Sequence, residues 1–578
     1  MFPIAPSSAS QPFQTRRPRV ARLLAMGLLL GASLVIGVQA GDRPPGHAVA
    51  SAHPLATKAG LDILAAGGNA FDAAVAVTAA IAVVEPTGSG IGGGGFWLLH
   101  RQSDGFETMV DGREVAPMAA NADMYLGSDG NAVDKASRDG ARSAAIPGEP
   151  AALVYLAKKY GRLPLAKSLQ PAIGYAKNGF PADAKLIKAI EQSAKRFSPA
   201  AKAIFMPGGK VPAVGQTIRQ TDLAGVLQRL ADKGLPGFYS GETAKRLLAG
   251  VADAGGIWTA EDLHRYTVVE RAPIVSHFRD YKLVSAAPPS AGGLALAETL
   301  QQLEALGWTD TTDGTSKHLV IEALRRAYRD RAAYLGDPDF VPLPIAKLTS
   351  RSYALELAAQ IDREHATPSA SLPPTGPQAK GGDNTSHFSV IDADGNRVSA
   401  TMSINLSFGS AYIPPGTGIL LNDEMDDFAA STTASNAYGL IGSAANLIAP
   451  RKRPLSTMTP TFVEGPNGVL VIGTPGGSRI ATMVLLGILN FINGADAKAI
   501  VGAPRYHHQY LPDVVQFEPG GLNPAEQARL TALGHVLKPL DSPYGNLQAV
   551  IWKPATDTLD AAADPRGVGS GEVRLTRR

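Results

Sequence analysis

The stretch TSHFSVIDADGNRVSATMSIN, residues 385–405, decides how we interpret the fold of this chain of 578 residues. Its two halves, residues 387–391 and 398–402, are rich in β-branched and aromatic side chains, which favour strands. The Asp-Ala-Asp-Gly-Asn sequence between them is typical of a tight turn. The stretch therefore predicts a β-hairpin.

The loop length of this hairpin sets which residues face each other. A three-residue loop closed by Asp392 and Asn396, with Gly395 in the left-handed conformation, places Ser403 opposite Thr385. A two-residue loop instead shifts the partner of Thr385 by one residue. In both cases two hydroxyl side chains lie at the open end of the hairpin, which is an unusual position for residues that only pack.

Residues 363–384, which precede the hairpin, are rich in Pro, Gly, Ser and Ala and show no apolar periodicity, so we expect a flexible tail. Its abrupt end at a strand that begins with Thr suggests cleavage between Asn384 and Thr385. Cleavage would give Thr385 a free α-amine. The ordinary pKa of such an amine is about 7.7–8.0, so its neutral form can take the proton of the hydroxyl and activate it as a nucleophile. The alternative is an uncleaved loop that enters an ordinary hairpin.

The hairpin and its continuation NLSFGSAYIPPGTGILLNDEMDDF resemble the small-subunit start of the γ-glutamyltranspeptidases, N-terminal-nucleophile hydrolases that cleave themselves before a Thr. The resemblance covers nearly the whole chain after residue 40. Further motifs stand in the family's order: AGLDILAAGGNAFDAAVAVTAAIAVVEPTGSGIGGGGFWLL, DGREVAP, PPSAGG, EALRRAYRDRAAYLGDPDF, RPLSTMTPT, GTPGGSRI and APRYHHQYLPD.

The resemblance implies an α+β fold, the four-layer αββα sandwich of N-terminal-nucleophile hydrolases, built jointly from two subunits. Residues 41–384 would form the large subunit, with its flexible tail at 363–384, and residues 385–578 the small subunit. The implied activity is that of a γ-glutamyltransferase and glutathione hydrolase, which passes the γ-glutamyl group of glutathione to water or to an amino acid or peptide amine. We expect no cofactor, no metal and no nucleic-acid partner.

The resemblance also implies the catalytic residues. Thr385 would be the nucleophile and Ser403 would orient its hydroxyl. From the residues alone, Gly476-Gly477 at a helix start admits a plain turn, a phosphate cradle or an oxyanion hole; the resemblance supports the oxyanion hole, whose donors contribute roughly 3–4 kcal/mol each. Ser403 stands where the family usually has Thr, which keeps the hydroxyl and removes a methyl group.

The α-carboxylate of the substrate is expected to bind Arg113 and the hydroxyls of Ser456 and Thr457. Without the family, a lone Arg beside a Glu is typical of a solvated ion pair, and the two hydroxyls are typical of a strand edge. A planar guanidinium is well shaped for a carboxylate. Thr457 replaces the usual second Ser, and Asn384 stands at a position that the family treats loosely.

The α-amino group of the substrate is expected to bind Glu424 and Asp427, assisted by Asn405. The two acids stand three residues apart, so a turn of the chain would bring them together. The small polar segment 429–439 is suited to a mobile flap. The resemblance implies that it is the lid over the substrate pocket, with Tyr438 as its closing aromatic residue.

The other motifs of the chain predict structure and no catalytic or binding site. Residues 55–84 predict two helices broken near Gly67-Gly68, and the glycines that follow lead into a strand without the Lys-Ser/Thr of a nucleotide-binding loop. Those glycines predict a close approach of backbones in the core. Residues 141–361 show mostly helical periodicity. Adjacent His507 and His508 point apart on a strand, which disfavours a metal site.

Residues 1–40 predict an export signal, with four arginines, an apolar run and the small-residue exit Val38-Gln39-Ala40. An uncleaved anchor is the alternative, and the Arg16-Arg17 pair leaves twin-arginine export open beside the general secretory route. We therefore expect an exported protein, periplasmic or secreted. The remaining chain has 50 basic and 51 acidic residues, a net charge of −1, which disfavours nucleic acid as a partner.

The composition, 45% hydrophobic and 18% charged with 62 Gly and 43 Pro, is typical of a loop-rich globular protein. The absence of Cys excludes a thiol nucleophile, disulfides and thiolate metal ligands. Two rival functions remain at this point. One is a cephalosporin or glutaryl acylase with the same fold, and the other is an uncleaved, secreted homologue that binds amino acids.

Overall fold

The structure, a computed structural model, describes residues 43–129, 132–372, 384–429 and 443–576. The predicted export signal, most of the predicted lid including Tyr438, and the second half of the predicted tail lie outside the described residues. No helix in these ranges is both long and apolar enough to cross a membrane.

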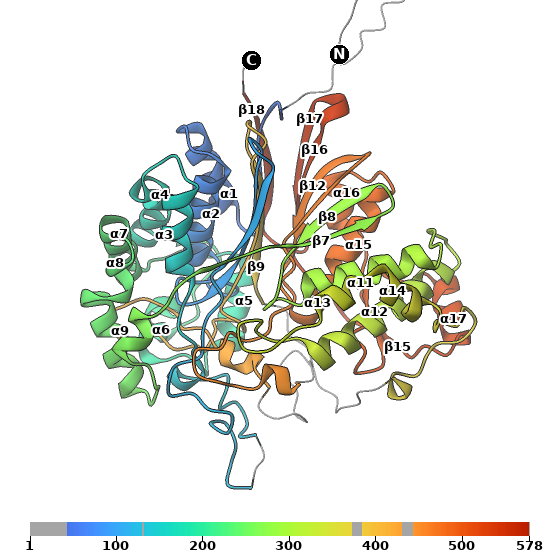
Figure 1. Cartoon of the computed structure of the whole chain (residues 1–578). Helices are drawn as coiled ribbons and strands as arrows, with labels where there is room; N and C mark the ends of the chain where they lie inside the picture. Colours follow the sequence, from blue (N-terminus) through green and yellow to red (C-terminus); the bar gives the residue numbers. More distant parts are fainter. Residues whose placement is uncertain (1–42, 130–131, 373–383, 430–442, 577–578) are drawn as a thin grey trace, which may run out of the picture. The chain divides into compact units, whose positions relative to one another are not determined.

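Two stacked β-sheets form the centre of residues 43–576 (Figure 1). The first has seven strands: β18 (Ser570–Leu575), β1 (Gly46–Ser51), β9 (Ser386–Ile391), β10 (Arg397–Ser403), β2 (Gly94–Arg101), β3 (Phe106–Asp111) and β6 (Val269–Arg271), in this spatial order. The second has six: β17 (Thr558–Ala563), β16 (Gln548–Lys553), β12 (Gly468–Gly473), β11 (Thr461–Gly465), β8 (Tyr281–Ser285) and β7 (Ile274–Phe278).

Helices cover the outer face of each sheet (Figure 1). The layer on the seven-stranded sheet contains α1 (Pro54–Ala65), α2 (Ala70–Val84), α3 (Glu149–Lys159), α4 (Leu165–Asn178), α7 (Thr221–Lys233), α8 (Pro236–Tyr239) and α9 (Gly241–Asp253). The layer on the six-stranded sheet contains α11 (Gly292–Ala305), α12 (Thr315–Tyr334), α13 (Ile345–Leu348), α14 (Arg351–Ala358), α15 (Ile480–Ile492), α16 (Ala497–Gly502) and α17 (Pro524–Ala532). The predicted αββα sandwich is confirmed.

The remaining elements include a two-stranded sheet, β4-β5, and a three-stranded sheet, β13-β14-β15. They are β4 (Phe180–Pro181), α5 (Ala184–Ser193), α6 (Pro199–Phe205), β5 (Thr217–Ile218), α10 (Ala260–His264), β13 (Tyr506–His507), β14 (Val515–Phe517) and β15 (Leu537–Pro539).

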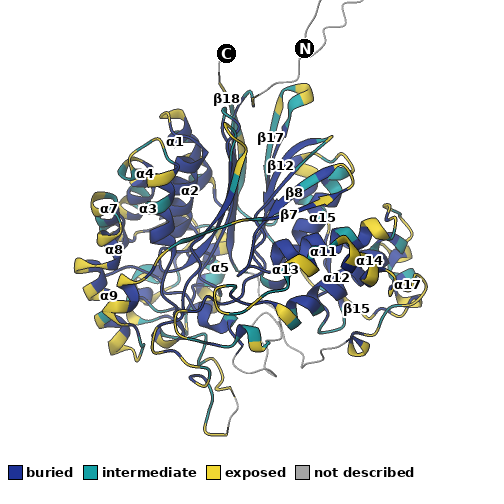
Figure 2. Ribbon diagram, in the orientation of Figure 1, coloured by how far each residue is buried: buried dark blue, intermediate teal, exposed yellow. Residues whose placement is uncertain are grey.

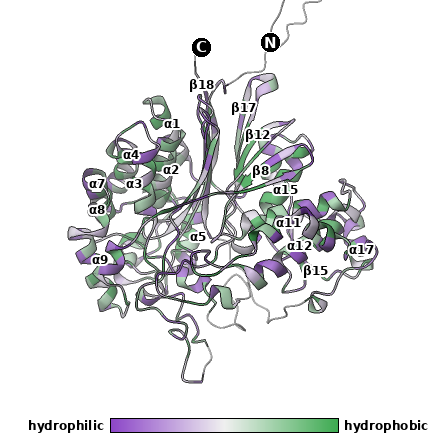
Figure 3. Ribbon diagram, viewed as in Figure 1, coloured by the Kyte–Doolittle hydropathy of each residue, from purple (hydrophilic) through white to green (hydrophobic). Residues whose placement is uncertain are grey.

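The central strands β1, β9, β10 and β2 of the seven-stranded sheet are buried on both faces (Figure 2). Along β2, Trp97 and Leu99 belong to the core shared with α1 and α2, whereas Phe96 and Leu98 belong to the core between the sheets. Successive side chains of a strand point to opposite faces, so one apolar run serves both cores. Hydrophobic residues also gather in the six-stranded sheet and in α15 behind it (Figure 3).

The central hairpin of β9 and β10 has the predicted three-residue loop. Asp392 N–H donates to the Asn396 carbonyl at 3.0 Å, and Gly395 has a φ of +91°. The pairs Ile391–Arg397 and Ser386–Met402 fix the register, which continues to Thr385 opposite Ser403. The two-residue loop is thereby excluded.

The first ten residues of the predicted flexible tail, residues 363–372, make specific contacts with the rest of the chain. The backbone N–H of Thr367 donates to the Glu322 carboxylate at 3.1 Å, and that of Ser369 donates to Asp513 at 2.7 Å. Leu372 is buried, and its carbonyl accepts a hydrogen bond from Tyr510. Polar side chains far away in the sequence satisfy the backbone of this segment, so it is ordered without apolar periodicity.

Candidate active site

Thr385 lies at the open end of the central hairpin, directly before β9. It is buried, and its hydroxyl donates a hydrogen bond to the carbonyl oxygen of Asn384, the residue on the other side of the predicted cleavage point. Ser403 ends the neighbouring strand β10 and is also buried. The hairpin register therefore places both hydroxyl residues at the same end of the central strands of the seven-stranded sheet.

The backbone of the glycine-rich segment before β2 lies close to the backbone at this end of the hairpin, as predicted. A Cβ atom on Gly93 would lie 2.1 Å from the Ser403 carbonyl oxygen, and one on Gly88 would lie 2.7 Å from that of Thr385. Neither distance accommodates a side chain.

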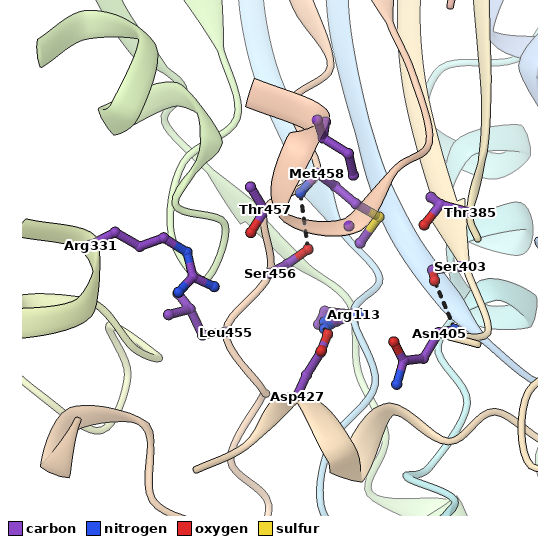
Figure 4. A pocket seen from close by; sticks show the side chains of 12 residues that line it. Arg113, Arg331, Thr385, Ser403, Asn405, Asp427, Leu455, Ser456, Thr457 and Met458 are labelled. Atoms are coloured by element: carbon purple, nitrogen blue, oxygen red, sulfur yellow. Dashed lines mark hydrogen bonds and ion pairs between the residues drawn. The ribbon is translucent and has the colours of Figure 1, made fainter. Parts of the chain in front are cut away.

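A pocket lies at this end of the hairpin (Figure 4). Residues far apart in the sequence line it: Arg113, Arg331, Thr385, Ser403, Asn405, Asp427, Leu455, Ser456, Thr457, Met458, Gly477 and Ile480. The predicted site residues among them thus lie together, which spacing along the chain alone could not establish.

Ser403 and Asn405 form a tight local structure after β10. The Asn405 backbone N–H donates to the Ser403 hydroxyl at 2.8 Å, and the Asn405 side-chain amide donates to the Asp423 carbonyl at 3.0 Å. Asn405 adopts a left-handed backbone with a φ of +72°, a conformation that Asn tolerates better than most residues. Its side chain is thereby held at the pocket wall.

Arg113 is a buried ion-pair centre and not a solvated one. Its guanidinium lies 2.7 Å from the Glu424 carboxylate, 2.6 Å from Asp427 and 3.5 Å from Glu114. Glu424 and Asp427 occupy one 3₁₀ turn, Glu424–Asp427, so the predicted proximity of the two acids is confirmed. The resemblance implies that Arg113 binds the substrate carboxylate and that Glu424 and Asp427 bind the substrate ammonium. In the structure, Arg113 forms ion pairs with both acids.

Burial and mutual repulsion dominate the electrostatics of the acids. Burial raises the pKa of Glu424 to about 7 and that of Glu114 to about 8. Burial and the neighbouring charge of Glu424 raise the pKa of Asp427 to about 7, against the opposing effect of Arg113. Three carboxyl groups around Arg113, one of which lines the pocket, therefore have pKa values near neutral pH.

Ser456 and Thr457 stand in the segment that leads to β11. The Ser456 backbone N–H donates to Pro289 and its carbonyl accepts from Ala291, so the segment is fixed against the PPSAGG motif. The Ser456 hydroxyl accepts a hydrogen bond from Met458 N–H at 3.1 Å. The Thr457 side chain lines the pocket beside it (Figure 4).

Gly476 and Gly477 form the predicted turn between β12 and α15, with φ values of +136° and +54° that favour glycine. Within the described residues, neither backbone N–H donates a hydrogen bond. Unpaired N–H groups at a pocket suit a developing negative charge on a substrate oxygen.

Sequence reasoning missed two residues of α12. Tyr328 donates a hydrogen bond to the Ser478 carbonyl in the Gly476–Gly477 turn, and Arg331 enters the pocket. A signal was present, because Leu324, Tyr328 and Arg331 stand at the four- and three-residue spacing of one helix face. A helix face that continues from buried apolar residues to an Arg indicates a buried cation.

His507 and His508 are both buried and committed to hydrogen bonds. His507 pairs with Thr482 and Gln509, and His508 pairs with Asp513. Burial lowers the pKa of His507 to about 3 and that of His508 to about 4, so both rings are neutral at physiological pH.

Comparison with known protein sequences gives one family. The family model described as Gamma-glutamyltranspeptidase matches residues 56–573. The glutathione hydrolase proenzyme of Pseudomonas sp. (strain A14) is 42% identical over 493 residues, which covers 84% of this chain and 85% of that protein. The glutathione hydrolase proenzyme of Escherichia coli (strain K12) is 40% identical over 527 residues, 90% of each protein.

Two solved structures extend the comparison to the fold. The cephalosporin acylase of Bacillus halodurans superposes with a TM-score of 0.80 at 29% identity, covering 93% of this chain and 97% of that one. The gamma-glutamyltranspeptidase of Helicobacter pylori superposes with a TM-score of 0.54 at 38% identity, covering 56% of this chain and 94% of that one. The architecture is therefore shared between an acylase and a transpeptidase, so the fold alone does not distinguish the two activities.

Proposed function

The chain belongs to the gamma-glutamyltranspeptidase family, an enzyme family, and from this premise we propose that it is a glutathione hydrolase and γ-glutamyl transferase that cleaves itself before Thr385. The observation that carries the proposal is the Thr385 hydroxyl, which donates to the Asn384 carbonyl in a pocket lined by Arg113 and Asp427. Glu424 pairs with Arg113 behind the pocket wall.

Self-cleavage begins when the Thr385 Oγ1 attacks the Asn384 carbonyl carbon. The acyl group moves from nitrogen to oxygen as an ester, and water hydrolyses the ester to an Asn384 carboxylate and a free Thr385 amine. Residues 41–384 then form the large subunit and residues 385–578 the small subunit. Their contacts are those already present in the uncleaved chain.

Turnover uses the new terminus. The neutral Thr385 amine accepts the proton of its own hydroxyl as Oγ1 attacks the γ-carbonyl carbon of glutathione. The N–H groups of Gly476 and Gly477 stabilise the oxyanion, and Ser403 orients the nucleophile. Collapse expels cysteinylglycine with a proton from the Thr385 ammonium and leaves a γ-glutamyl ester. Water or an acceptor amine then attacks the ester and releases the enzyme.

Recognition of the γ-glutamyl group follows from charge. Its ammonium enters between Glu424 and Asp427 with help from Asn405, and its α-carboxylate meets Arg113 and the hydroxyls of Ser456 and Thr457. Because Arg113 already pairs with both acids, the incoming zwitterion extends an existing charge network instead of creating one. Tyr438 would close the pocket from the predicted lid.

The first experiment is Thr385→Ala. The variant is expected to remain a single band of full length on a denaturing gel and to hydrolyse no γ-glutamyl-p-nitroanilide, whereas the wild type gives two bands and turns over. A single wild-type band after long incubation would instead support the uncleaved amino-acid-binding protein. Mass spectrometry of the active enzyme identifies the new terminus, and a terminus other than Thr385 contradicts the proposal.

The rival acylase function rests on the likeness to the B. halodurans enzyme. A glutaryl group lacks the α-ammonium, so it would leave Glu424 and Asp427 without a positive partner from the substrate. We therefore expect γ-glutamyl-p-nitroanilide to be the better substrate than a glutaryl cephalosporin by kcat/KM. The opposite preference would establish the acylase.

Export completes the proposal. Removal of residues 1–40 after Ala40 would release the enzyme outside the cytoplasm, where it meets extracellular glutathione and amine acceptors. Fractionation of cells and the N-terminal mass of the large subunit test this step, and a large subunit that begins at Met1 would contradict it.

A further inference from the structure

Arg331 is a buried cation that has no hydrogen-bond or ion-pair partner among the residues that the structure describes. It lies on α12, is 4% exposed and lines the pocket. Within the described residues, its side chain makes no hydrogen bond and no ion pair, and its Nε atom is buried. Its neighbours on the same helix differ, because Arg325 and Arg326 both pair with Glu322.

An unpaired buried charge is costly, since a guanidinium loses its hydration and gains no counter-ion. Burial lowers the pKa of Arg331 to about 10, which still leaves the side chain protonated at neutral pH. Asp427 contributes a favourable electrostatic interaction but does not approach within ion-pair distance. An anion that enters the pocket would therefore offset the free-energy cost of burying the Arg331 guanidinium without a counter-ion.

The position of Arg331 indicates which anion this is. Its guanidinium points into the pocket beside Leu455, Ser456 and Thr457, on the side away from Thr385 and Ser403 (Figure 4). A γ-glutamyl group whose γ-carbonyl carbon lies at Thr385 would place its α-carbon toward that far side. Arg113 lies there too, but its guanidinium is already occupied by Glu424 and Asp427.

We propose that Arg331 is a second guanidinium for the α-carboxylate of the γ-glutamyl donor, which lies between Arg331 and Arg113 next to Ser456 and Thr457. This inference rests on the proposed function and adds a specificity-determining residue to it. Arg113 balances the two acids that hold the ammonium, and Arg331 supplies the charge that the α-carboxylate requires.

The test compares two donors on two variants. γ-Glutamyl-p-nitroanilide carries the α-carboxylate, and 4-aminobutanoyl-p-nitroanilide is the same molecule without it. Arg331→Met is expected to raise KM for the first donor about 10- to 100-fold with a smaller change in kcat, and to leave kcat/KM for the second within about twofold of the wild type. Arg331→Lys, which keeps the charge but not the planar fork, is expected to lie between.

Arg329→Met is the matched control, because Arg329 lies on the same helix, pairs with Asp330 and does not line the pocket. Its kinetics are expected to match the wild type. Equal losses on both donors for Arg331→Met, or no loss on the first, would overturn the inference. If Arg331→Met does not fold, the same comparison with Arg331→Lys decides. Failure of the wild type itself to cleave or to use γ-glutamyl-p-nitroanilide contradicts the proposed function instead.

Discussion

At the scale of single residues, the acids that we propose to bind the substrate ammonium predict a pH dependence of activity. Burial raises the pKa of Glu424 and of Asp427 to about 7, so both lose negative charge as the pH falls through neutrality. A neutral carboxyl pairs weakly with an ammonium. We expect kcat/KM for γ-glutamyl-p-nitroanilide to fall about 10-fold between about pH 8 and pH 6, largely through KM.

The Thr385 amine titrates in the same range, and its protonation below about pH 8 lowers kcat. Glu424→Gln separates the two effects, because it removes one titrating acid from the binding step and leaves the amine in place. Its KM is expected to be higher than that of the wild type at about pH 8 and to vary less with pH. A KM profile as steep as that of the wild type would contradict the assignment.

Residue identity alone did not reveal how these charges are paired. The family resemblance assigned Arg113 to a carboxylate and Glu424 and Asp427 to an ammonium, yet the side chains pair with each other across the pocket. Arg331 is one of four arginines in the sequence RRAYRDR. Only tertiary packing determines which of these arginines has no acidic ion-pair partner among the described residues. Charge pairing of this kind depends on distances between distant segments, which a sequence does not contain.

At the scale of elements, α12 contacts the turn that carries the proposed oxyanion donors, Gly476 and Gly477. The Tyr328 hydroxyl donates to the Ser478 carbonyl, and the Ser478 hydroxyl donates to Gln509 at 2.6 Å. Tyr328→Phe removes the first contact and leaves a buried carbonyl unpaired. We expect kcat to fall about 5- to 10-fold with KM nearly unchanged, less than the roughly 100- to 1000-fold loss for removal of an oxyanion donor.

Kinetic and stability measurements on Tyr328→Phe distinguish support of the turn from a general loss of packing. A variant whose KM rises as much as its kcat falls, or whose self-cleavage is abolished, would show that Tyr328 acts on more than the turn. Thermal unfolding provides the control, and a loss of about 1–3 kcal/mol is expected for the unpaired carbonyl.

Elements with local signals were predictable and elements fixed by distant contacts were not. The register of the β9–β10 hairpin followed from its turn residues, because Gly395 and the Asp392–Asn396 pair are close in sequence. The segment 363–372 has no such local signal. It is held by Glu322 and Asp513, more than a hundred residues away from one another, so composition alone suggested disorder.

At the scale of the whole molecule, the predicted cleavage divides a fold whose two parts are interleaved. In the seven-stranded sheet, β1 from the large part lies between β18 and β9 of the small part, and β10 pairs with β2. In the six-stranded sheet, β11 of the small part pairs with β8 of the large part. Separation would therefore expose strand edges in both sheets together with both apolar cores.

We expect the cleaved subunits to elute together in gel filtration and to separate only in denaturant. Because cleaved unfolding releases two chains, its midpoint should rise with protein concentration, whereas that of uncleaved Thr385→Ala should not. Measurement of both midpoints in guanidinium over about a 100-fold concentration range checks this, since mass action shifts the free energy by about 2.7 kcal/mol over that range. Subunits that separate in native buffer would mean that the shared strands contribute little, and the interleaved sheets would then not explain how the cleaved enzyme stays together.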